Sequence, residues 1–412
     1  MDHLVSSPTI GVGASPAGLA SRSESGGRLS PALSPRLAGL TVCQFSTVQR
    51  TVDARAFFRE CAPLRAAGLR TRLLAPHGLD GLRDGVELSS LPARKNRFLR
   101  MLLAPALLPT LLRQRAHLYH FHDPELIPLG LLLKLIFRRK VVYDCREDFP
   151  CMMAHKRYLP ANLRPLVAWS LFALEGLAAR FLDGVLTADA STMRGFARLG
   201  RSRKLVFFNF PNLEFFPEPP SVPKHYDLVY RGGIADRTGT GVLLEALCIL
   251  RDQGRPTKTL LLGYFDNPRA EQVIRAQMAA RGLTDCIDLL SRIDHSHMAA
   301  ALAQARIGVC PLQAVPKFLR NIPVKVFEYW ASGLPVVTSD LPPIRPFFRH
   351  AEYGFLVKPG DAAALASSIQ WLLEHPVDAC RMGARGRAAV IERLNNTNEI
   401  RKLLAFYSRI LE

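Results

Sequence analysis

The chain has 412 residues, of which 48% are hydrophobic and 22% are charged, and a chain of this length suggests two domains. The composition excludes a wholly disordered chain, a collagen and a small disulfide scaffold. Lysine and arginine number 54 against 35 aspartates and glutamates, so the net charge is +19. Residues 39–215 hold 27 of the basic groups and 14 of the acidic groups, which places the basic surface mainly in the first half. Such a surface suits nucleic acid, anionic lipid headgroups, phosphorylated substrates or solvent alone.

The sequence predicts a cytoplasmic protein. No apolar run reaches the roughly 18 residues of a membrane-spanning helix, and the start of the chain lacks the basic and apolar stretches of a secretory signal. The eight cysteines form no C-x-x-C pair and no cluster with histidine at zinc-ligand spacing. We therefore expect reduced thiols and no bound metal.

Strand-like runs alternate with helical patterns from Gly39 onward, after a segment 1–38 whose serine, proline, glycine and alanine content predicts a disordered tail. The predicted strands are 40–45, 70–75, 118–121, 141–143, 184–187, 205–208, 228–231, 259–262, 307–310 and 335–338. The predicted helices include 55–67, 163–180, 240–251, 269–281 and 298–305. This alternation predicts an α/β fold with parallel sheets covered by helices on both faces.

A linker divides the alternation into two blocks, because residues 210–223 contain five prolines. We place an N-terminal domain at 39–215 and a C-terminal domain at 216–394, followed by a helix at 395–412. Two doubly wound domains create a cleft at the carboxyl ends of their strands, where ligands bind in such folds.

The most informative segment is 321–340, NIPVKVFEYWASGLPVVTSD, which follows the predicted strand 307–310. Pro323 suits the first turn of a helix, and a helix start offers free N–H groups to an anion. Lys325 can pair with phosphate oxygens, and Glu328 on the same helix face can accept hydrogen bonds from two ribose hydroxyls. Taken alone, such a pair is more often an exposed ion pair. Its place between a strand-end loop and a further strand favours nucleotide binding.

A glycine-rich loop opens the second block, in the segment 228–239, LVYRGGIADRTG. Gly232 and Gly233 would let the backbone approach a diphosphate closely. Arg231 and Arg237 flank the glycines and could supply positive charge. The alternative is a tight turn with exposed arginines.

Polar side chains also follow two neighbouring strands of the first half, in the segments 120–126, HFHDPEL, and 142–150, VYDCREDFP. His122 lies at a strand end facing the cleft, where it could hydrogen-bond a hydroxyl group of a ligand, and Asp123 adjoins it. Such groups, and Asp144 with them, are more often caps and ion-pair partners than catalysts. Because both segments occur together, we predict that His122 and Asp123 are catalytic.

These segments resemble those of the retaining GT-B glycosyltransferases of family 4. The segment 321–340 is similar to their donor-binding motif P-x-K-x-F-E-Y-M-A-x-G-x-P-V-V, with Trp330 where methionine is usual. The segment 228–239 resembles their phosphate loop. The segments 120–126 and 142–150 resemble their acceptor-domain loops, H-x-H-D-P-E and Y-D-x-H-E-D-x-P.

The resemblance covers about residues 40–412 and implies a GT-B fold, with two Rossmann-like domains facing a cleft and the terminal helix returning to the first domain. It implies that Glu328 holds the ribose of a nucleotide-sugar donor, that no cofactor is tightly bound, and that the leaving phosphate assists acceptor deprotonation. The chain departs from the family at Arg146, where histidine is usual, and at Arg320, where many members have glutamate. No Asp-x-Asp occurs, so the metal-bridged diphosphate site of the other main glycosyltransferase fold is not indicated.

We therefore predict a transferase that moves a sugar from a nucleotide-sugar donor to a glycan or lipid-linked acceptor with retention, in the synthesis of a surface polysaccharide or glycoconjugate. Two alternatives stay open: a GT-B sugar-nucleotide epimerase, and a non-catalytic basic protein that binds glycan or nucleic acid. Nucleic acid is the less favoured partner, because no known module is present and aromatic residues are not interleaved with the basic runs.

The segment 91–116 predicts peripheral association with an anionic membrane surface. Between Leu91 and Ala116 it holds six basic residues, no acidic one and nine large apolar ones, which is the composition of an interfacial segment. Pro105 and Pro109 favour two short helices over one. The alternative is an ordinary pair of domain helices with leucines facing the core.

Overall fold

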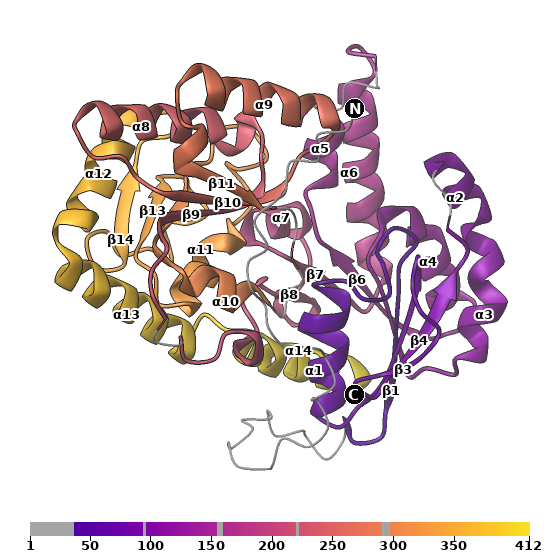
Figure 1. Cartoon of the computed structure of the whole chain (residues 1–412). Helices are drawn as coiled ribbons and strands as arrows, with labels where there is room; N and C mark the ends of the chain where they lie inside the picture. The colour runs from indigo at the N-terminus through magenta and orange to yellow at the C-terminus, as the bar shows by residue number, and fades with distance from the viewer. Residues whose placement is uncertain (1–36, 94–95, 155–159, 220–221, 291–292, 294–296) are drawn as a thin grey trace, which may run out of the picture. The chain divides into compact units, whose positions relative to one another are not determined.

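Two largely parallel sheets organise the chain, as the computed structural model shows for residues 37–412 except 94–95, 155–159, 220–221, 291–292 and 294–296 (Figure 1). All of these described residues belong to one unit by their contacts. Apolar clusters lie on both faces of each sheet, beneath the covering helices. The predicted α/β class is therefore confirmed.

The first sheet has eight strands in the order β3-β4-β2-β1-β5-β6-β7-β8, and only β3 is antiparallel to its neighbour. The strands are β1 (Thr41–Phe45), β2 (Arg70–Pro76), β3 (Gly81–Arg83), β4 (Val86–Leu91), β5 (Leu118–Phe121), β6 (Lys140–Cys145), β7 (Gly184–Thr187) and β8 (Lys204–Val206). The helices of this half are α1 (Ala62–Ala66), α2 (Arg97–Leu103), α3 (Leu108–Arg113), α4 (Ile127–Leu135), α5 (Phe149–Ala154), α6 (Arg164–Phe181) and α7 (Ala190–Met193).

The second sheet has six parallel strands in the order β11-β10-β9-β12-β13-β14. The strands are β9 (Tyr226–Gly233), β10 (Thr259–Tyr264), β11 (Ile287–Leu290), β12 (Ala305–Cys310), β13 (Val336–Ser339) and β14 (Gly354–Val357). The helices are α8 (Thr240–Asp252), α9 (Pro268–Ala280), α10 (Met298–Ala303), α11 (Val324–Ala331), α12 (Ala362–Glu374), α13 (Pro376–Glu392) and α14 (Asn396–Leu411). The strand order reverses between β9 and β12, which is where doubly wound sheets bind ligands.

Each strand predicted from the sequence is present, within about two residues of its predicted ends, whereas β3, β4, β11 and β14 were not predicted. β3 is exposed throughout and β14 has four residues, so neither carries a clear pattern of buried positions. The predicted helix at 55–67 begins as a π-helical turn, Ala56–Cys61, and continues as α1. Of the predicted tail 1–38, only residues 37 and 38 lie among the described residues, and Leu37 is buried.

A glycine sets the position of α11, the helix of the segment 321–340. A Cβ atom at Gly308 of β12 would lie 2.5 Å from the ring of Tyr329, so only glycine lets α11 lie this close to the sheet. The Tyr329 hydroxyl then accepts a hydrogen bond from the backbone N–H of Arg231 at 2.7 Å. These contacts hold α11 against β12 and beside the end of β9.

The C-terminal helix α14 packs against the first sheet. Its buried face is apolar from Ile400 onward, and it joins a cluster with Val42, Leu118 and Leu186 from three strands of that sheet. Phe406 fills the space above Gly184, where a Cβ atom would lie 2.4 Å from the phenyl ring. The helix therefore completes the core of the first half although it follows the second half in sequence.

The segment 91–116 forms two short helices, α2 and α3, joined by a 3-10 turn at Ala104–Leu107, as its prolines predict. Leu111 is buried in α3, and three other leucines of the turn and α3 pack against the core. By contrast, Leu102 is 75% exposed in α2. The leucines of α3 thus face the core, as expected for an ordinary domain helix, whereas the apolar side chains of α2 are exposed. No helix of the described residues is long and apolar enough to cross a membrane.

The docking of α14 can be tested with Phe406→Ala. Phe406 is fully buried, so its truncation should lower the free energy of unfolding by about 3–5 kcal/mol. Urea unfolding measures this, with exposed Arg401→Ala on the same helix as the control, which should cost less than about 0.5 kcal/mol. Equal stability of the two variants would show that α14 does not contribute to the core.

Candidate functional site

A cavity of about 330 Å³ lies between residues of the two halves, at the carboxyl ends of their strands. From the first half it is lined by Arg146, Glu147, Ala188, Asp189, Phe208, Asn209 and Phe210. From the second half it is lined by Gly232, Gly233, Arg237, Thr238, Tyr264, Leu312, Lys317, Phe318, Asn321, Ile322, Pro323, Val324, Lys325 and Phe327. Four of the seven site residues predicted from the sequence, Gly232, Gly233, Arg237 and Lys325, therefore line one cavity.

The wall at Gly232 and Lys325 combines bare backbone with a positive charge. Gly232 has a φ of +127°, which favours glycine, and a Cβ atom there would lie 2.9 Å from the Lys325 ammonium. That ammonium lies 4.1 Å from the centre of the Tyr230 ring, which holds it at the end of β9. The start of α11 at Pro323 and Val324 lines the same wall. A helix start, a glycine loop and a lysine together suit an anion such as a diphosphate.

Arg237 lies at the edge of this wall and is held by Asp266, with Arg237 Nη1 2.5 Å and Nη2 3.0 Å from the two carboxylate oxygens. Its side chain is about half exposed. The next residue, Thr238, closes the loop by donating from its hydroxyl to the Gly233 carbonyl at 2.8 Å. Arg237 can therefore reach an anion in the cavity, but part of its charge is already compensated.

Glu328 lies behind the wall and does not line the cavity. Its carboxylate is fully buried, with Arg231 Nη1 at 2.6 Å and Arg59 Nη2 at 3.6 Å. Neither carboxylate oxygen has a well-aligned hydrogen bond from the described residues, so both keep acceptor capacity. A buried carboxylate between two guanidinium groups is electrostatically compensated, and removal of its charge would leave both cations unopposed.

Arg59 is a site residue that sequence reasoning missed. It lies in the π-helical turn of the first half, and its Nε donates to the Phe210 carbonyl at 3.1 Å while its guanidinium faces Glu328. Burial lowers the pKa of Arg59, and Glu328 offsets part of that effect. An arginine inside a run of apolar residues was the available signal, but the sequence does not show which carboxylate it meets.

His122 lies in a buried network rather than at the cavity surface. Its Nδ1 is 3.0 Å from Asp144 Oδ2, and its Nε2 is 3.2 Å from Gln44 Oε1, so both ring nitrogens have partners. Burial and Arg146 lower the pKa of His122, although Asp144 opposes this. We predicted that His122 faces the cleft. Instead its side chain is buried among Gln44 and Asp144 at the ends of the strands, and it does not line the cavity.

Asp123 organises a loop. Its Oδ2 accepts hydrogen bonds from the Ser46 hydroxyl and the Thr47 backbone N–H, both at 2.7 Å, and one from the Thr47 hydroxyl at 3.3 Å. The carboxylate is almost fully buried. These contacts hold the loop after β1 against the end of β5. Asp123 was predicted to lie beside a reacting group, whereas here its carboxylate is engaged by this loop.

Arg55 is the centre of the buried network. Its guanidinium donates to both oxygens of Asp144 at 2.8 and 2.9 Å, and its Nε is 3.0 Å from Glu60 Oε1. Burial alone would raise the pKa of Asp144, but Arg55, His122 and Arg146 lower it well below its usual range. Burial, together with the charge of Asp144, raises the pKa of Glu60 to about 8 despite Arg55.

The same network has the composition of a metal site, since Glu60, His120, His122 and Asp144 bring ligand atoms within 4.8 Å of one another. However, the Arg55 guanidinium already occupies both carboxylates and supplies the positive charge that a metal would supply. The donor set therefore fits a hydrogen-bonded structural network better than a metal centre.

Ion pairs connect the two halves beside the cavity. Lys317 Nζ lies 3.2 Å from Glu147 Oε1. Arg320, which stands where many family 4 glycosyltransferases have glutamate, pairs with Asp148. Arg146 is held by Asp53 at 3.2 Å. The arginines that depart from the family pattern thus have carboxylate partners.

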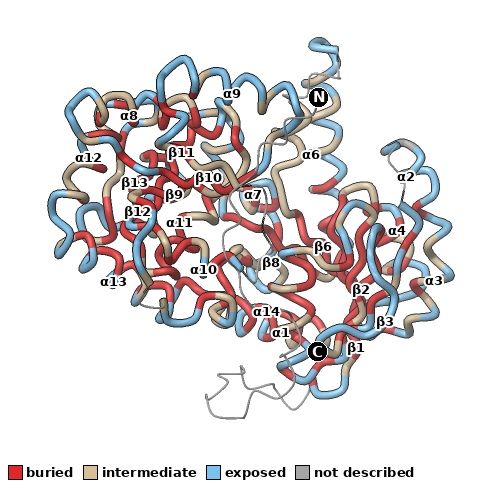
Figure 2. Tube along the Cα trace, viewed as in Figure 1, coloured by how far each residue is buried: buried red, intermediate tan, exposed pale blue. Residues whose placement is uncertain are grey.

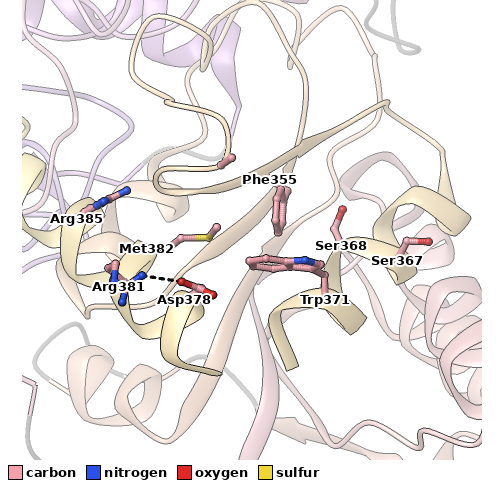
Figure 3. A pocket seen from close by; sticks show the side chains of 9 residues that line it. Phe355, Ser367, Ser368, Trp371, Asp378, Arg381, Met382 and Arg385 are labelled. Carbon is pink, nitrogen blue, oxygen red and sulfur yellow. Dashed lines mark hydrogen bonds and ion pairs between the residues drawn. The ribbon is translucent and has the colours of Figure 1, made fainter. Parts of the chain in front are cut away.

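A second hollow, of about 680 Å³, lies among α12, α13 and β14 (Figure 3). Its aromatic wall is Trp371 and Phe355, and Arg381 on its rim pairs with Asp378 at 2.8 Å. None of the predicted site residues lines it, and it lies apart from the strand ends that carry the glycine loop. The smaller cavity is therefore the candidate site.

Two segments match known protein families. Residues 225–375 match the family described as "Glycosyl transferases group 1", and residues 54–209 match the "Glycosyl transferase 4-like domain". These matches favour a glycosyltransferase over the epimerase and nucleic-acid-binding alternatives.

The curated relatives include the amylovoran biosynthesis glycosyltransferase AmsK of Erwinia amylovora, 30% identical over 178 residues, which are 43% of each chain. Phosphatidyl-myo-inositol mannosyltransferase of Mycobacterium leprae is 32% identical over 225 residues, 54% of this chain and 51% of that one. The chain thus spans about half the length of the curated relatives that it matches.

Solved structures share the fold. Sucrose-phosphate synthase from Thermosynechococcus elongatus has a TM-score of 0.71 at 19% identity, over 90% of this chain and 98% of that one. Anabaena Alr3699/HepE in complex with UDP and glucose has a TM-score of 0.68 at 16% identity, over 90% and 99%. The predicted GT-B fold, with two Rossmann-like domains, is confirmed.

Glu60→Gln tests the buried network through its pH dependence. Because the pKa of Glu60 is raised from 4.5 to about 8 in the folded state, its contribution to stability is present at low pH and is lost as pH rises through that interval. The unfolding free energy of the wild type minus that of Glu60→Gln should therefore fall from pH 4.5 toward pH 8.

Urea unfolding at several pH values measures this difference, and Glu392→Gln, with a side chain 74% exposed, is the control. Parallel curves for the wild type and Glu60→Gln would contradict the raised pKa.

Proposed function

We propose that this chain transfers a sugar from a nucleoside-diphosphate sugar with retention of configuration, and its matches to two glycosyltransferase domain families, over residues 54–209 and 225–375, support the proposal. The acceptor in this proposal is a glycan or a lipid-linked glycan, and the product belongs to a surface polysaccharide or glycoconjugate. Support for the donor comes from the cavity and from HepE, whose structures hold UDP and UDP-glucose. Support for the acceptor comes from the names of AmsK and of the phosphatidyl-myo-inositol mannosyltransferases.

The observation that carries the proposal is the wall formed by Gly232, Gly233, Lys325 and the start of α11. Cleavage of a nucleotide sugar leaves negative charge on the diphosphate as the glycosidic bond breaks. Backbone N–H groups, a helix start and an ammonium that are already in place stabilise that charge without rearrangement. In our proposal these groups bind the diphosphate, and Arg237 adds charge at its edge.

We propose that the donor ribose binds next to this wall and reaches the buried carboxylate of Glu328 when the side chain of Arg231, which now pairs with it, moves aside. Arg231, which pairs with Glu328, directly precedes Gly232 in β9, so the carboxylate lies close to the proposed diphosphate position. The two carboxylate oxygens keep acceptor capacity for a pair of hydroxyls.

His122 and Asp123 act as positioning residues in this proposal rather than by touching the substrate. His122 contacts Asp144, and Asp144 lies 3.5 Å from Arg146, which lines the cavity. Asp123 holds the loop after β1. The first half therefore offers the acceptor a wall that contains Arg146, Glu147 and Asp189. Peripheral membrane association, which a lipid-linked acceptor would favour, stays a prediction.

A screen of nucleoside diphosphates by calorimetry and of their sugars by slow hydrolysis tests the function directly. With the best ligand, Lys325→Ala should weaken binding about 10- to 150-fold, because a charged partner contributes roughly 1.5–3 kcal/mol. Exposed Lys358→Ala, in the same half, should leave affinity unchanged. Unchanged affinity in Lys325→Ala, or no diphosphate bound by the wild type, would refute the donor site.

The ribose assignment is tested by comparing the same nucleoside diphosphate with its 2′-deoxy form. The wild type should prefer the ribose form about 10-fold, since a hydrogen bond to a charged group is lost in the deoxy form. Glu328→Gln should bind both forms equally, and thermal unfolding would check that the variant is folded. A variant that keeps the full preference would show that Glu328 has only a structural role.

A further inference from the structure

Helix α6 presents an apolar face to solvent. Its buried residues, Glu175, Ala178 and Ala179, lie on one narrow side. The outward side and the residue before the helix carry large apolar side chains that are between 42% and 66% exposed: Leu163, Leu166, Trp169, Phe172, Leu174, Leu177 and Phe181. Figure 2 draws most of this helix in the colours of exposed and intermediate residues. A surface helix of a globular protein normally has the reverse pattern.

The helix is nevertheless firmly anchored. Glu175 accepts a hydrogen bond from the Tyr143 hydroxyl of β6 at 2.7 Å, and Arg203 donates to the carbonyls of Ala179 and Arg180 at 2.9 Å. Ala178 and Ala179 belong to the core beneath the first sheet. The apolar face is therefore a property of the folded helix, held outward by its contacts on the other side.

The charges around this face are of one sign. The stretch 160–206, which is described without a gap, contains seven basic residues and three acidic ones. Each acidic side chain is engaged: Glu175 is buried, Asp189 caps α7, and Asp183 pairs with Lys134 at 2.7 Å. The exposed charge in this stretch is thus wholly positive.

Three of the arginines lie close to the apolar face. Arg180 is on α6 itself and is exposed. Arg194 follows α7 and directly precedes Gly195, whose Cβ position lies 3.7 Å from the ring of Phe172, and Arg198 comes three residues after that glycine. Both are exposed. The acidic residues before α5, Glu147 and Asp148, are paired with Lys317 and Arg320.

We propose that this face of α6 docks on an anionic lipid bilayer. The helix would lie in the plane of the interface, with Trp169 and Phe172 below the headgroups and Arg180, Arg194 and Arg198 among them. It does not qualify as a membrane-spanning helix. A second copy of the chain is a poorer occupant, because a two-fold interface would bring the same arginines together. This surface differs from the segment 91–116, where α3 faces the core and Arg100 pairs with Glu125 at 2.6 Å.

Tryptophan emission gives a direct readout on the full chain. The protein has three tryptophans, of which Trp330 is fully buried and Trp371 stacks on His375 in the second half. Vesicles of equal parts phosphatidylglycerol and brominated phosphatidylcholine should quench the emission of Trp169. Trp169→Phe should lose this quenching while it still sediments with the vesicles.

Sedimentation with vesicles tests the surface. Binding should require phosphatidylglycerol, should be absent with phosphatidylcholine alone and should fall with salt. Leu166→Gln with Trp169→Gln should weaken it at least 10-fold. Arg194→Ser with Arg198→Ser should weaken it about 25-fold, since each basic group near an anionic leaflet contributes about a 5-fold factor.

Matched variants elsewhere serve as controls and should leave binding unchanged. Val377→Gln with Ile391→Gln removes two equally exposed apolar side chains from α13, and Arg269→Ser with Arg385→Ser removes two exposed charges from the second half. Met101→Gln with Leu102→Gln removes two exposed apolar side chains from α2.

The proposal is overturned if no vesicle binds the wild type, or if the α2 variant and not the α6 variant loses binding. It is also overturned if sedimentation velocity shows a dimer that the α6 variant dissociates, or if deletion of residues 1–36 is needed before vesicles bind. Vesicle binding requires no nucleotide sugar, so its failure and a failure of the proposed transferase activity are separate results.

Discussion

The guanidinium of Arg55 connects the elements from which the first half of the candidate site is built. It bonds Asp144 at the end of β6, approaches Glu60 in the π-helical turn, and donates to the Phe207 carbonyl at 3.0 Å beyond β8. Two buried carboxylates and two buried histidines would otherwise be costly to fold around. Because this one guanidinium pairs with both carboxyl groups, the strand ends can converge, and Arg146 is positioned at the cavity wall.

In the second half the numbers of buried acids and cations are reversed. There a single buried carboxylate, Glu328, faces two guanidinium groups, and one of them, Arg59, belongs to the first half. An ion pair therefore joins the two halves at the back of the cavity. At its side, Lys317 and Arg320 of the second half pair with acidic residues of the first half. The wall around Gly232 keeps its lysine without a carboxylate partner of its own among the described residues, and an anionic ligand would supply one.

The basic excess of the chain is distributed in a way that its total does not show. The two arginines that line the cavity, Arg146 and Arg237, are paired with acids, so they contribute little net charge. Arg180, Arg194 and Arg198, which lie around α6, have no such acidic partner in the stretch 160–206. An apolar helix face beside unpaired cations is costly in water and useful at an anionic surface, which is why the two features are best explained together.

Local patterns in the sequence determined the alternating elements, the linker and the glycine loop, because side-chain periodicity and turn residues act over a few positions. The grouping of Gly232, Gly233, Arg237 and Lys325 followed from the same patterns, since parallel strands bring their carboxyl ends to one edge. Tertiary structure alone decided that His122, Asp123 and Glu328 lie behind the cavity and that Arg59 reaches Glu328. It also decided that α6 faces outward, since the same apolar composition suits a core helix. Those outcomes depend on which residues distant in sequence compensate a buried charge or cover an apolar face, and no local pattern contains that information.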